Sequence, residues 1–310
     1  MRGITNKNYL LPKGRVLLRC YSRRGIGFFL DNWRPLSLLN NDYKIAARVL
    51  SKRLQRVLSS IISTDQRDFI KKRSAAENMR LVQDVIDYLK TSNSSGIIFF
   101  LDFKKAFDNV SHFFLFHVLR KFNFKEYFIC WIKTFYTDAI GRVMNNGWIS
   151  EKLLIGRGVR QGCPLSALRF NIVVEILACK IRQNKNIKGI DIFSVDLGID
   201  SLKISQYADD TTLFVESVND IQYIMNEIND FGDYAGPKIN WNKTEVMKLN
   251  TVDNFVHDNA IIYTDQPVKY LGVYVGENKK LLQDLNWNVK IDKIRNVLKM
   301  WKMRGFTFYG

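Results

Sequence analysis

The chain has 310 residues, of which 47 are Lys or Arg and 30 are Asp or Glu, so its formal net charge is +17. A hydrophobic fraction of 46% excludes a disordered chain, and this charge favours a polyanionic partner, with nucleic acid the first candidate. Residues 1–90 hold 19 basic and 7 acidic residues (net +12), residues 281–310 hold 6 and 2 (net +4), and residues 91–280 hold 22 and 21 (net +1), which excludes a uniformly basic tail.

The first helical pattern covers residues 43–62 and follows a stretch, residues 1–30, that shows no clear periodicity. Beside its apolar face lie Arg48, Lys52 and Arg56, which are four residues apart and form a basic stripe. The stripe is either an ordinary solvated face or a face that follows phosphates, and the sequence leaves both interpretations open. A second helix is predicted at residues 75–90.

From residue 97 onward, helices and strands alternate irregularly. Further helices are predicted at residues 111–121, 128–135, 164–182, 221–235 and 288–304. Strands are predicted at residues 97–103, 202–208, 211–216, 243–249 and 268–275, with a hairpin turn at 145–147. Because a strict βαβα rhythm is missing, we predict an α+β fold with helices packed on an antiparallel sheet.

The four cysteines have neither metal-ligand nor redox spacing, which favours a reducing compartment. The longest strongly apolar runs, such as residues 97–101, are too short to span a bilayer, and the N-terminus has no signal-peptide pattern. We therefore expect no membrane partner and an intracellular protein of the nucleus or the cytoplasm.

Two acidic features stand at the ends of predicted strands. Asp102 closes an otherwise apolar strand, and Asp209 and Asp210 lie at the tip of a predicted hairpin. Turn geometry alone explains each feature equally well, since Asp is common in tight turns. Together, three carboxylates at neighbouring strand ends need a compensating cation, and hard oxygen ligands select Mg²⁺ or Mn²⁺. Two such ions serve in-line phosphoryl transfer, which suits a basic protein with an acidic centre.

Five short boxes are spread over the chain between residues 32 and 272. They are NWRPLSLLN at 32–40, LDFKKAFD at 101–108, RQGCPLS at 160–166, YADD at 207–210 and YLG at 270–272. In order and spacing, these boxes resemble the reverse transcriptase of non-LTR (LINE-type) retrotransposons. The resemblance implies a right-hand polymerase whose palm has an antiparallel sheet and packed helices. It implies a truncated N-terminal edge at residues 1–9, fingers and palm at 10–276, and the start of a truncated thumb at 277–310.

The same resemblance implies an RNA-directed DNA polymerase that joins dNTPs to a primer 3′-OH by two-metal-ion nucleotidyl transfer. Asp102 and Asp209 would bind both Mg²⁺ (or Mn²⁺) ions, and Asp210 would contribute more weakly. Asp108, one helical turn beyond Asp102, is interpreted as structural.

A second set of residues acquires roles from the resemblance. Lys13 and Arg34 are candidates for the triphosphate, and Phe107 for the gate that excludes a 2′-hydroxyl. Gln161 and Gly162 would let the backbone approach template and nucleotide. Lys243 is either an acid for the leaving pyrophosphate or an ordinary surface lysine. The box of Tyr270, Leu271 and Gly272 resembles the primer grip.

Departures from the family's pattern support an alternative. Residues 14–30 are longer than the corresponding loop, and Arg169 stands on an otherwise apolar helix face, where a charge needs an anion or solvent. The chain resembles a piece of a polyprotein whose further domains are missing, with an RNA template and a DNA primer or target as partners. The alternative is an inactive nucleic-acid-binding remnant of such an element.

Overall fold

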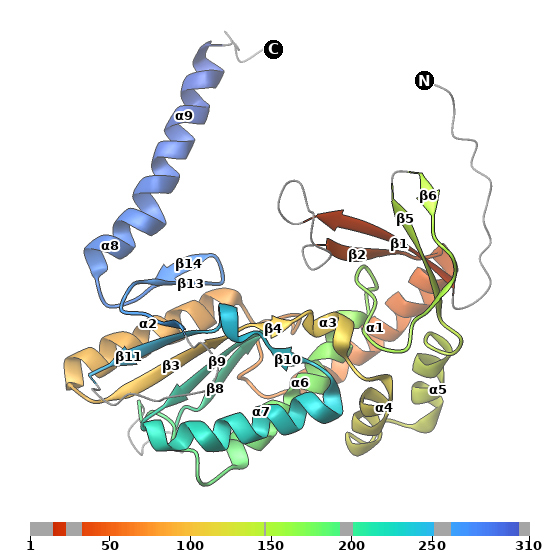
Figure 1. Ribbon diagram of the computed structural model, residues 1–310, viewed down its shortest axis with the longest axis horizontal. Helices are drawn as coiled ribbons and strands as arrows, with labels where there is room; N and C mark the ends of the chain where they lie inside the picture. The colour runs from red at the N-terminus through yellow and green to blue at the C-terminus, as the bar shows by residue number, and fades with distance from the viewer. Residues whose placement is uncertain (1–14, 23–32, 146, 193–200, 251–261, 304–310) are drawn as a thin grey trace. The chain divides into compact units, whose positions relative to one another are not determined.

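The structure is a computed structural model that describes residues 15–22, 33–145, 147–192, 201–250 and 262–303. The chain forms two compact units that share the sequence in alternating segments (Figure 1). Unit 1 comprises residues 1–73, 103–184 and 223–239, and unit 2 comprises residues 74–102, 185–222 and 240–310. Each unit is therefore assembled from three separate stretches of the chain.

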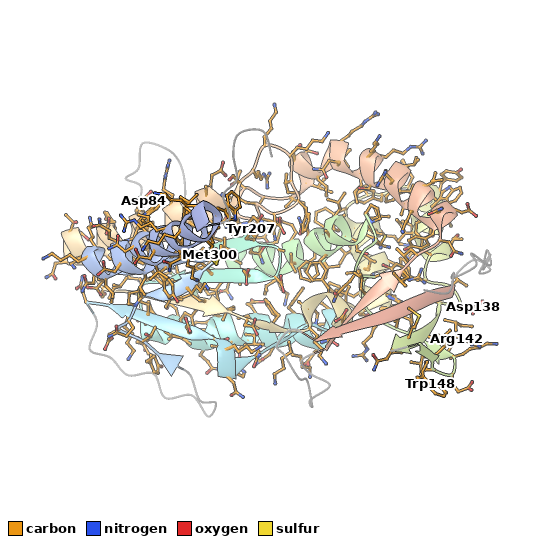
Figure 2. All side chains as sticks on the ribbon, turned by 90° about the horizontal axis from the view of Figure 1, so that it is seen from above. Asp84, Asp138, Arg142, Trp148, Tyr207 and Met300 are labelled. Carbon is orange, nitrogen blue, oxygen red and sulfur yellow. The ribbon has the colours of Figure 1, made fainter. Side chains whose placement is uncertain are left out.

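Unit 1 contains a small mixed sheet in the order β2-β1-β5-β6, with β7 also paired to β5. Its strands are β1 (Arg15–Ser22), β2 (Trp33–Leu38), β5 (Ile140–Asn145), β6 (Trp148–Ile149) and β7 (Leu153–Leu154). β1 is antiparallel to β2 and parallel to β5, and it lies in a stretch for which the sequence predicted no element. Asn145 pairs with Trp148, which confirms the hairpin predicted there, and Figure 2 shows Arg142 and Trp148 on these two strands.

Helices and two short strands that pair with each other form the rest of the described part of unit 1. The most buried is α6 (Ser166–Gln183), which packs against α1 (Asn41–Ile61) and α4 (His112–Lys121). α6 begins at Ser166 rather than at Pro164 as predicted, because a turn precedes it in which Ser166 N donates to Cys163 O over 3.1 Å. The remaining elements are β4 (Phe103–Lys104), α3 (Ala106–Asn109), α5 (Glu126–Thr134), α7 (Ile221–Ala235) and β10 (Lys238–Ile239).

Unit 2 is built on a five-stranded sheet in the order β12-β11-β3-β9-β8. The strands are β3 (Gly96–Leu101), β8 (Ile204–Tyr207), β9 (Asp210–Val215), β11 (Glu245–Leu249) and β12 (Ile262–Tyr263). The pairs of β3 with β9 and β11, and of β8 with β9, are antiparallel, as predicted, whereas the edge pair β11–β12 is parallel. Every residue of β3 is buried, which explains its unbroken apolar sequence.

One helix, α2 (Ala75–Ser92), packs along this sheet (Figure 1). Ser74 caps it, because its Oγ accepts a hydrogen bond from Ala76 N over 3.2 Å. The predicted inward face is confirmed, since its fully buried members pack with strand residues such as Ile98 and Phe214 in one hydrophobic cluster. Each such side chain contributes about 1.5–3 kcal/mol by leaving water. Those members of α2 are Val82, Val85, Ile86 and Leu89.

The prediction of one continuous strand at residues 268–275 is wrong. The segment is a hairpin of β13 (Val268–Tyr270) and β14 (Val273–Val275). Its two turn residues, Leu271 and Gly272, have φ of 47° and 87°, the backbone of a two-residue turn that matches the twist of the strands.

The C-terminal helices follow this hairpin. They are α8 (Lys279–Gln283), a π-helical turn (Asp284–Asn288) and α9 (Val289–Met303). The helix predicted at 288–304 is confirmed, although residues 289–302 of it are all exposed. Within the described ranges, none of the helices has the length and apolar character needed to cross a membrane.

Candidate active site

The register of the unit 2 sheet brings the three predicted carboxylates to one end of adjacent strands. Leu101 of β3 pairs with Thr211 of β9. Asp102 directly follows Leu101, and Asp210 directly precedes Thr211, so these two aspartates continue the same register. Asp209 lies in the turn that joins β8 to β9. Residues 102 and 209–210, far apart in sequence, therefore lie at the same end of the adjacent strands β3, β9 and β8.

The hairpin turn differs by one residue from the prediction. The turn was predicted at Asp209–Asp210, but Asp210 pairs with Tyr207 and begins β9, so the turn residues are Ala208 and Asp209. Ala208 has φ of 52°, a left-handed conformation that costs a non-glycine residue about 1–2 kcal/mol. The surrounding strands must stabilise this turn, which fixes the place of Asp209.

Asp102 is held by the loop that carries Lys243, through a residue, Asn240, that has no predicted role. Asn240 N donates to Asp102 O over 2.7 Å, and Asn240 Nδ2 donates to Asp102 Oδ2 over 2.9 Å. The buried Thr244 adds a longer contact, from Asp102 N to its Oγ1 over 3.5 Å. Lys243, which is exposed, follows on the same loop, where its N–H donates to Asn240 O over 3.0 Å. An Asn-Trp-Asn-Lys-Thr run carries no signal of such a role.

A buried polar layer supports the hairpin. Asn78 of α2 donates through Nδ2 to Ser205 Oγ over 2.9 Å and to Gln206 O over 3.0 Å. Gln206 Nε2 in turn donates to Thr211 Oγ1 over 3.3 Å. All four residues are buried, and these hydrogen bonds connect α2 to both strands of the hairpin, although Asn78 Oδ1 and Gln206 Oε1 have no hydrogen-bond partner among the described residues.

The YLG box divides into a buried part and an accessible part. Tyr270 is 5% exposed, and its ring lies 5.6 Å from that of Phe100, centroid to centroid. Burial raises the pKa of the Tyr270 hydroxyl, and the nearby charge of Asp210 raises it further. At Gly272, by contrast, a Cβ would meet no heavy atom within 4 Å. The turn of this hairpin is therefore open to a bound molecule, whereas the Tyr270 side chain is not.

Of the residues predicted to bind the nucleotide, Arg34, Phe107, Gln161 and Gly162 lie in unit 1, whereas Lys243 lies in unit 2. Phe107 stacks on Phe170 at 4.2 Å between ring centroids, and Phe107 O accepts from Val159 N over 2.7 Å. Gln161 Nε2 donates to both carboxylate oxygens of Asp108, over 3.0 and 3.2 Å, which fits the structural role expected of Asp108.

Backbone contacts join this cluster to β2. Gln161 O accepts from Ser37 N over 3.0 Å, and Gly162, at φ of 92°, would place a Cβ only 3.2 Å from Ser37 O. Glycine is therefore required at position 162 for the close approach. Arg34 lies in the same strand, paired with Tyr21 of β1, and Lys13 lies outside the described residues.

Arg169 is buried, with a side chain that is 0% exposed. Its Nη2 donates to Ser166 Oγ over 3.0 Å, and its guanidinium carbon lies 4.8 Å from the ring centroid of Tyr136. Its Nε and Nη1 have no hydrogen-bond partner in the part of the chain that the structure describes. The anion or solvent expected for this charge is replaced by an aromatic face and a hydroxyl, which compensate it incompletely.

The carboxylates of unit 2 fit an open magnesium site better than a closed one. Among the described residues, His, Cys, Asp and Glu nowhere form a group of three or more that could enclose a metal ion. Mg²⁺ is usually bound by one or two carboxylates together with water and substrate phosphates. Asp102 and Asp209 supply that kind of donor set.

Comparisons with known proteins identify the family of the chain. The family model described as reverse transcriptase (RNA-dependent DNA polymerase) matches residues 21–275. The uncharacterized 149 kDa protein of transposon TX1 from Xenopus laevis is 32% identical over 266 residues, which cover 84% of this chain and 20% of that protein. The Pol polyprotein of the R2DM retrotransposable element from Drosophila melanogaster is 29% identical over 215 residues, covering 69% of this chain and 19% of that protein. The chain thus spans about a fifth of the length of these relatives.

Solved structures support the fold. Telomerase from Candida tropicalis superimposes with a TM-score of 0.59 at 14% sequence identity, over 85% of this chain and 44% of that chain. This likeness confirms the right-hand polymerase fold predicted from the five boxes. Together with the family match and the retrotransposon relatives, it shows that the chain belongs to the reverse transcriptase family, as a reverse transcriptase domain of the R2 and TX1 type.

Proposed function

We propose that this chain is the polymerase part of a larger retrotransposon protein and copies an RNA template into DNA from a primer 3′-OH, using dNTPs. The observation that carries the proposal is the register of β3 and β9, which sets Asp102 beside Asp210 at the start of β9 and close to the turn that holds Asp209. Three carboxylates at neighbouring strand ends repel one another, and bound divalent ions would relieve this repulsion.

In this proposal Asp102 and Asp209 hold two Mg²⁺ (or Mn²⁺) ions, and Asp210 adds negative charge beside them. When bound, the ions activate the primer 3′-OH and stabilise the leaving pyrophosphate. Asn240 keeps the Asp102 carboxylate oriented by its two hydrogen bonds. Lys243, on the same loop, donates a proton to the pyrophosphate, and the turn of Leu271 and Gly272 contacts the primer.

The unit 1 residues position the incoming nucleotide in the same proposal. Phe107 excludes a 2′-hydroxyl, and its stacking on Phe170 keeps the ring in place. Gln161 and Gly162 bring backbone close to template and nucleotide, and Lys13 and Arg34 bind the triphosphate. Residues 10–276 then act as fingers and palm, with residues 277–310 as the start of the thumb, in an intracellular ribonucleoprotein.

Primer extension on an RNA template tests the assignment. Asp209→Asn is expected to reduce dNTP incorporation by at least about 100-fold, because it removes a charge that stabilises the transition state. Asp233→Asn, at a carboxylate whose side chain is 74% exposed, serves as the control and should extend normally. Equal incorporation by wild type and Asp209→Asn would reject the site. RNA binding without any Mg²⁺-dependent extension by the wild type would favour the inactive remnant.

A further inference from the structure

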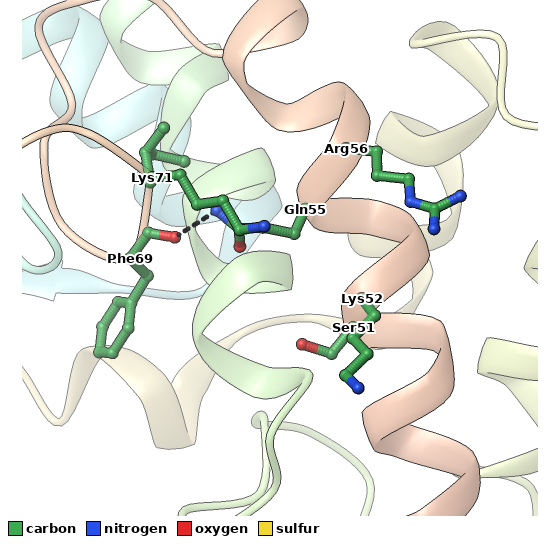
Figure 3. Close-up of a pocket in the computed structure, with 7 residues that line it drawn as sticks. Ser51, Lys52, Gln55, Arg56, Phe69 and Lys71 are labelled. Atoms are coloured by element: carbon green, nitrogen blue, oxygen red, sulfur yellow. Dashed lines mark hydrogen bonds between the residues drawn. The ribbon is translucent and has the colours of Figure 1, made fainter.

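Unit 1 contains a cavity of about 570 Å³ between α1 and the loop that follows it (Figure 3). From α1 it is lined by Ser51, Lys52, Gln55 and Arg56, and from the loop by residues 69–71. Its size falls within the range of pockets that take small organic molecules, about 300–1,000 Å³. The catalytic proposal above assigns no role to any of these residues.

The lining of this cavity is basic. Lys52, Arg56 and Lys71 line it, all three are exposed, and no Asp or Glu is among the lining residues. Within the described part of the chain, none of these three cations forms an ion pair with a carboxylate. Lys52 and Arg56 belong to the basic stripe of α1, so the cavity favours the interpretation of that stripe as a phosphate-following face over a solvated one.

An exposed aromatic ring stands beside the three cations. Phe69 is 51% exposed and has φ of 55°, a left-handed backbone that is rare for an aromatic residue. Its carbonyl accepts from Gln55 Nε2 over 3.1 Å, a bond drawn in Figure 3, and its N–H donates to Asp68 Oδ1 over 2.9 Å. The fold thus holds Phe69 outward, although burial of the ring would be more favourable.

Hydrogen bonds within the protein hold the loop that carries Phe69 before any ligand binds. Arg73 donates to Gln66 O over 2.6 Å, to Ile62 O over 3.0 Å and also to Ser63 O. Asn171 of α6 donates through Nδ2 to Asp68 O over 2.7 Å. A ligand of this cavity would therefore meet a prepared surface and lose little free energy in ordering the loop.

We propose that this cavity binds a segment of single-stranded RNA, with phosphates at Lys52, Arg56 and Lys71 and one base stacked on Phe69. Cations that follow the backbone beside an aromatic platform are the combination by which proteins hold single strands without reading their sequence. The choice of RNA rests on the proposed function, which requires a single-stranded RNA template. The cavity is a binding site separate from the carboxylates of unit 2.

The test measures binding of fluorescently labelled RNA and DNA strands of one sequence to the full 310-residue chain carrying Asp209→Asn, without Mg²⁺ or dNTPs. Because no catalysis is involved, failure here is distinct from failure of the polymerase assignment. The triple variant Lys52→Ala, Arg56→Ala, Lys71→Ala should weaken RNA binding. The slope of log Kobs against log salt concentration should also become less steep by about 2, because each phosphate contact contributes about 0.7 to the slope and three contacts are lost. The control is the triple variant Lys121→Ala, Lys125→Ala, Lys152→Ala, which removes the same amount of charge outside the cavity and should weaken RNA binding less.

Phe69→Ala tests the stacking contact separately. It should weaken RNA binding by about 5- to 150-fold while leaving the salt dependence unchanged. Tyr127→Ala, at an aromatic residue that is 72% exposed on α5, is the matched control and should bind normally. Equal losses in the cavity triple and its control, or a loss confined to DNA, would overturn the proposal. Loss on RNA, with or without loss on DNA, would support it.

Discussion

Asn240 holds Asp102 through both its backbone and its side chain, with hydrogen bonds of 2.7 Å to the carbonyl and 2.9 Å to Oδ2. The two residues are 138 positions apart, so the bonds tie a distant loop to the end of β3. The side-chain bond holds Oδ2 of the carboxylate and so fixes the orientation of the whole group, including Oδ1. Asn240 is therefore a positioning residue for Asp102.

Asn240→Ala should reduce polymerase activity by about 10- to 100-fold, the usual effect of removing a partner that orients a metal ligand. The Mg²⁺ concentration needed for half-maximal primer extension should rise, which a merely structural role would not cause. Asn242→Ala, an exposed neighbour on the same loop, is the control. An unchanged Mg²⁺ requirement in Asn240→Ala would show that Asp102 does not depend on this bond.

Arg169→Leu should stabilise the protein by about 1–4 kcal/mol, since a buried charge without a carboxylate partner is replaced by an apolar side chain. Chemical denaturation measures the change in the free energy of unfolding. Arg182→Leu, on the same helix, should have the opposite effect, because Arg182 pairs with Asp65 and with Glu175. If Arg169→Leu is as destabilising as Arg182→Leu, the guanidinium has a compensating partner after all.

His112 should make stability fall in mild acid. Burial lowers the pKa of its imidazole below 6.5, and the positive charges of Arg169 and Arg160 lower the pKa further. The contact of 2.8 Å between Nε2 and Gly158 O acts in the opposite direction and raises the pKa. The unfolded chain therefore takes up the proton first, and stability present above pH 6.5 is lost as the pH falls toward the folded pKa. Denaturation between pH 5 and 8, roughly spanning the histidine range, should show a smaller loss in His112→Gln. His117→Gln, at an exposed histidine, should behave like wild type.

Gly158 and Gly147 provide a matched pair, because both have φ of 88°. A Cβ at Gly158 would lie 2.6 Å from Asp108 O, whereas at Gly147 it would meet nothing within 4 Å. Gly147→Ala should cost about 1–2 kcal/mol, the strain of a left-handed backbone alone. Gly158→Ala should cost clearly more and raise KM for dNTPs, because Asp108 adjoins Phe107. Equal thermal stabilities of the two variants would contradict this contact.

The elements that the sequence predicted well are those stabilised by near neighbours. The apolar spacing of α2 leads directly to its buried face, with Val82, Val85, Ile86 and Leu89 inward. The place of the three aspartates at strand ends was also predicted, because their carboxylates contrast with the apolar strand interiors.

The features that sequence patterns missed depend on backbone conformation or on distant partners. Residues 268–275 alternate like a strand, and nothing in a leucine indicates the positive φ that Leu271 adopts. The bond of Asn240 to Asp102 and the ring of Tyr136 over Arg169 join segments that only the tertiary fold brings together. Tyr270 belongs to the YLG box that resembles the primer grip, yet its side chain packs in the hydrophobic core of unit 2.

The alternating segments of the two units have a consequence for synthesis on the ribosome. The central strand β3 emerges early, but its partners β9 and β11 follow more than 100 residues later. Until then an unbroken apolar strand has both hydrogen-bonding edges unpaired, which invites aggregation. Unit 1 likewise waits for residue 239 before its last stretch exists. We therefore expect nascent chains of this protein to be exposed to aggregation until residue 249 has been made, and neither unit can be produced by cutting the gene at a single point.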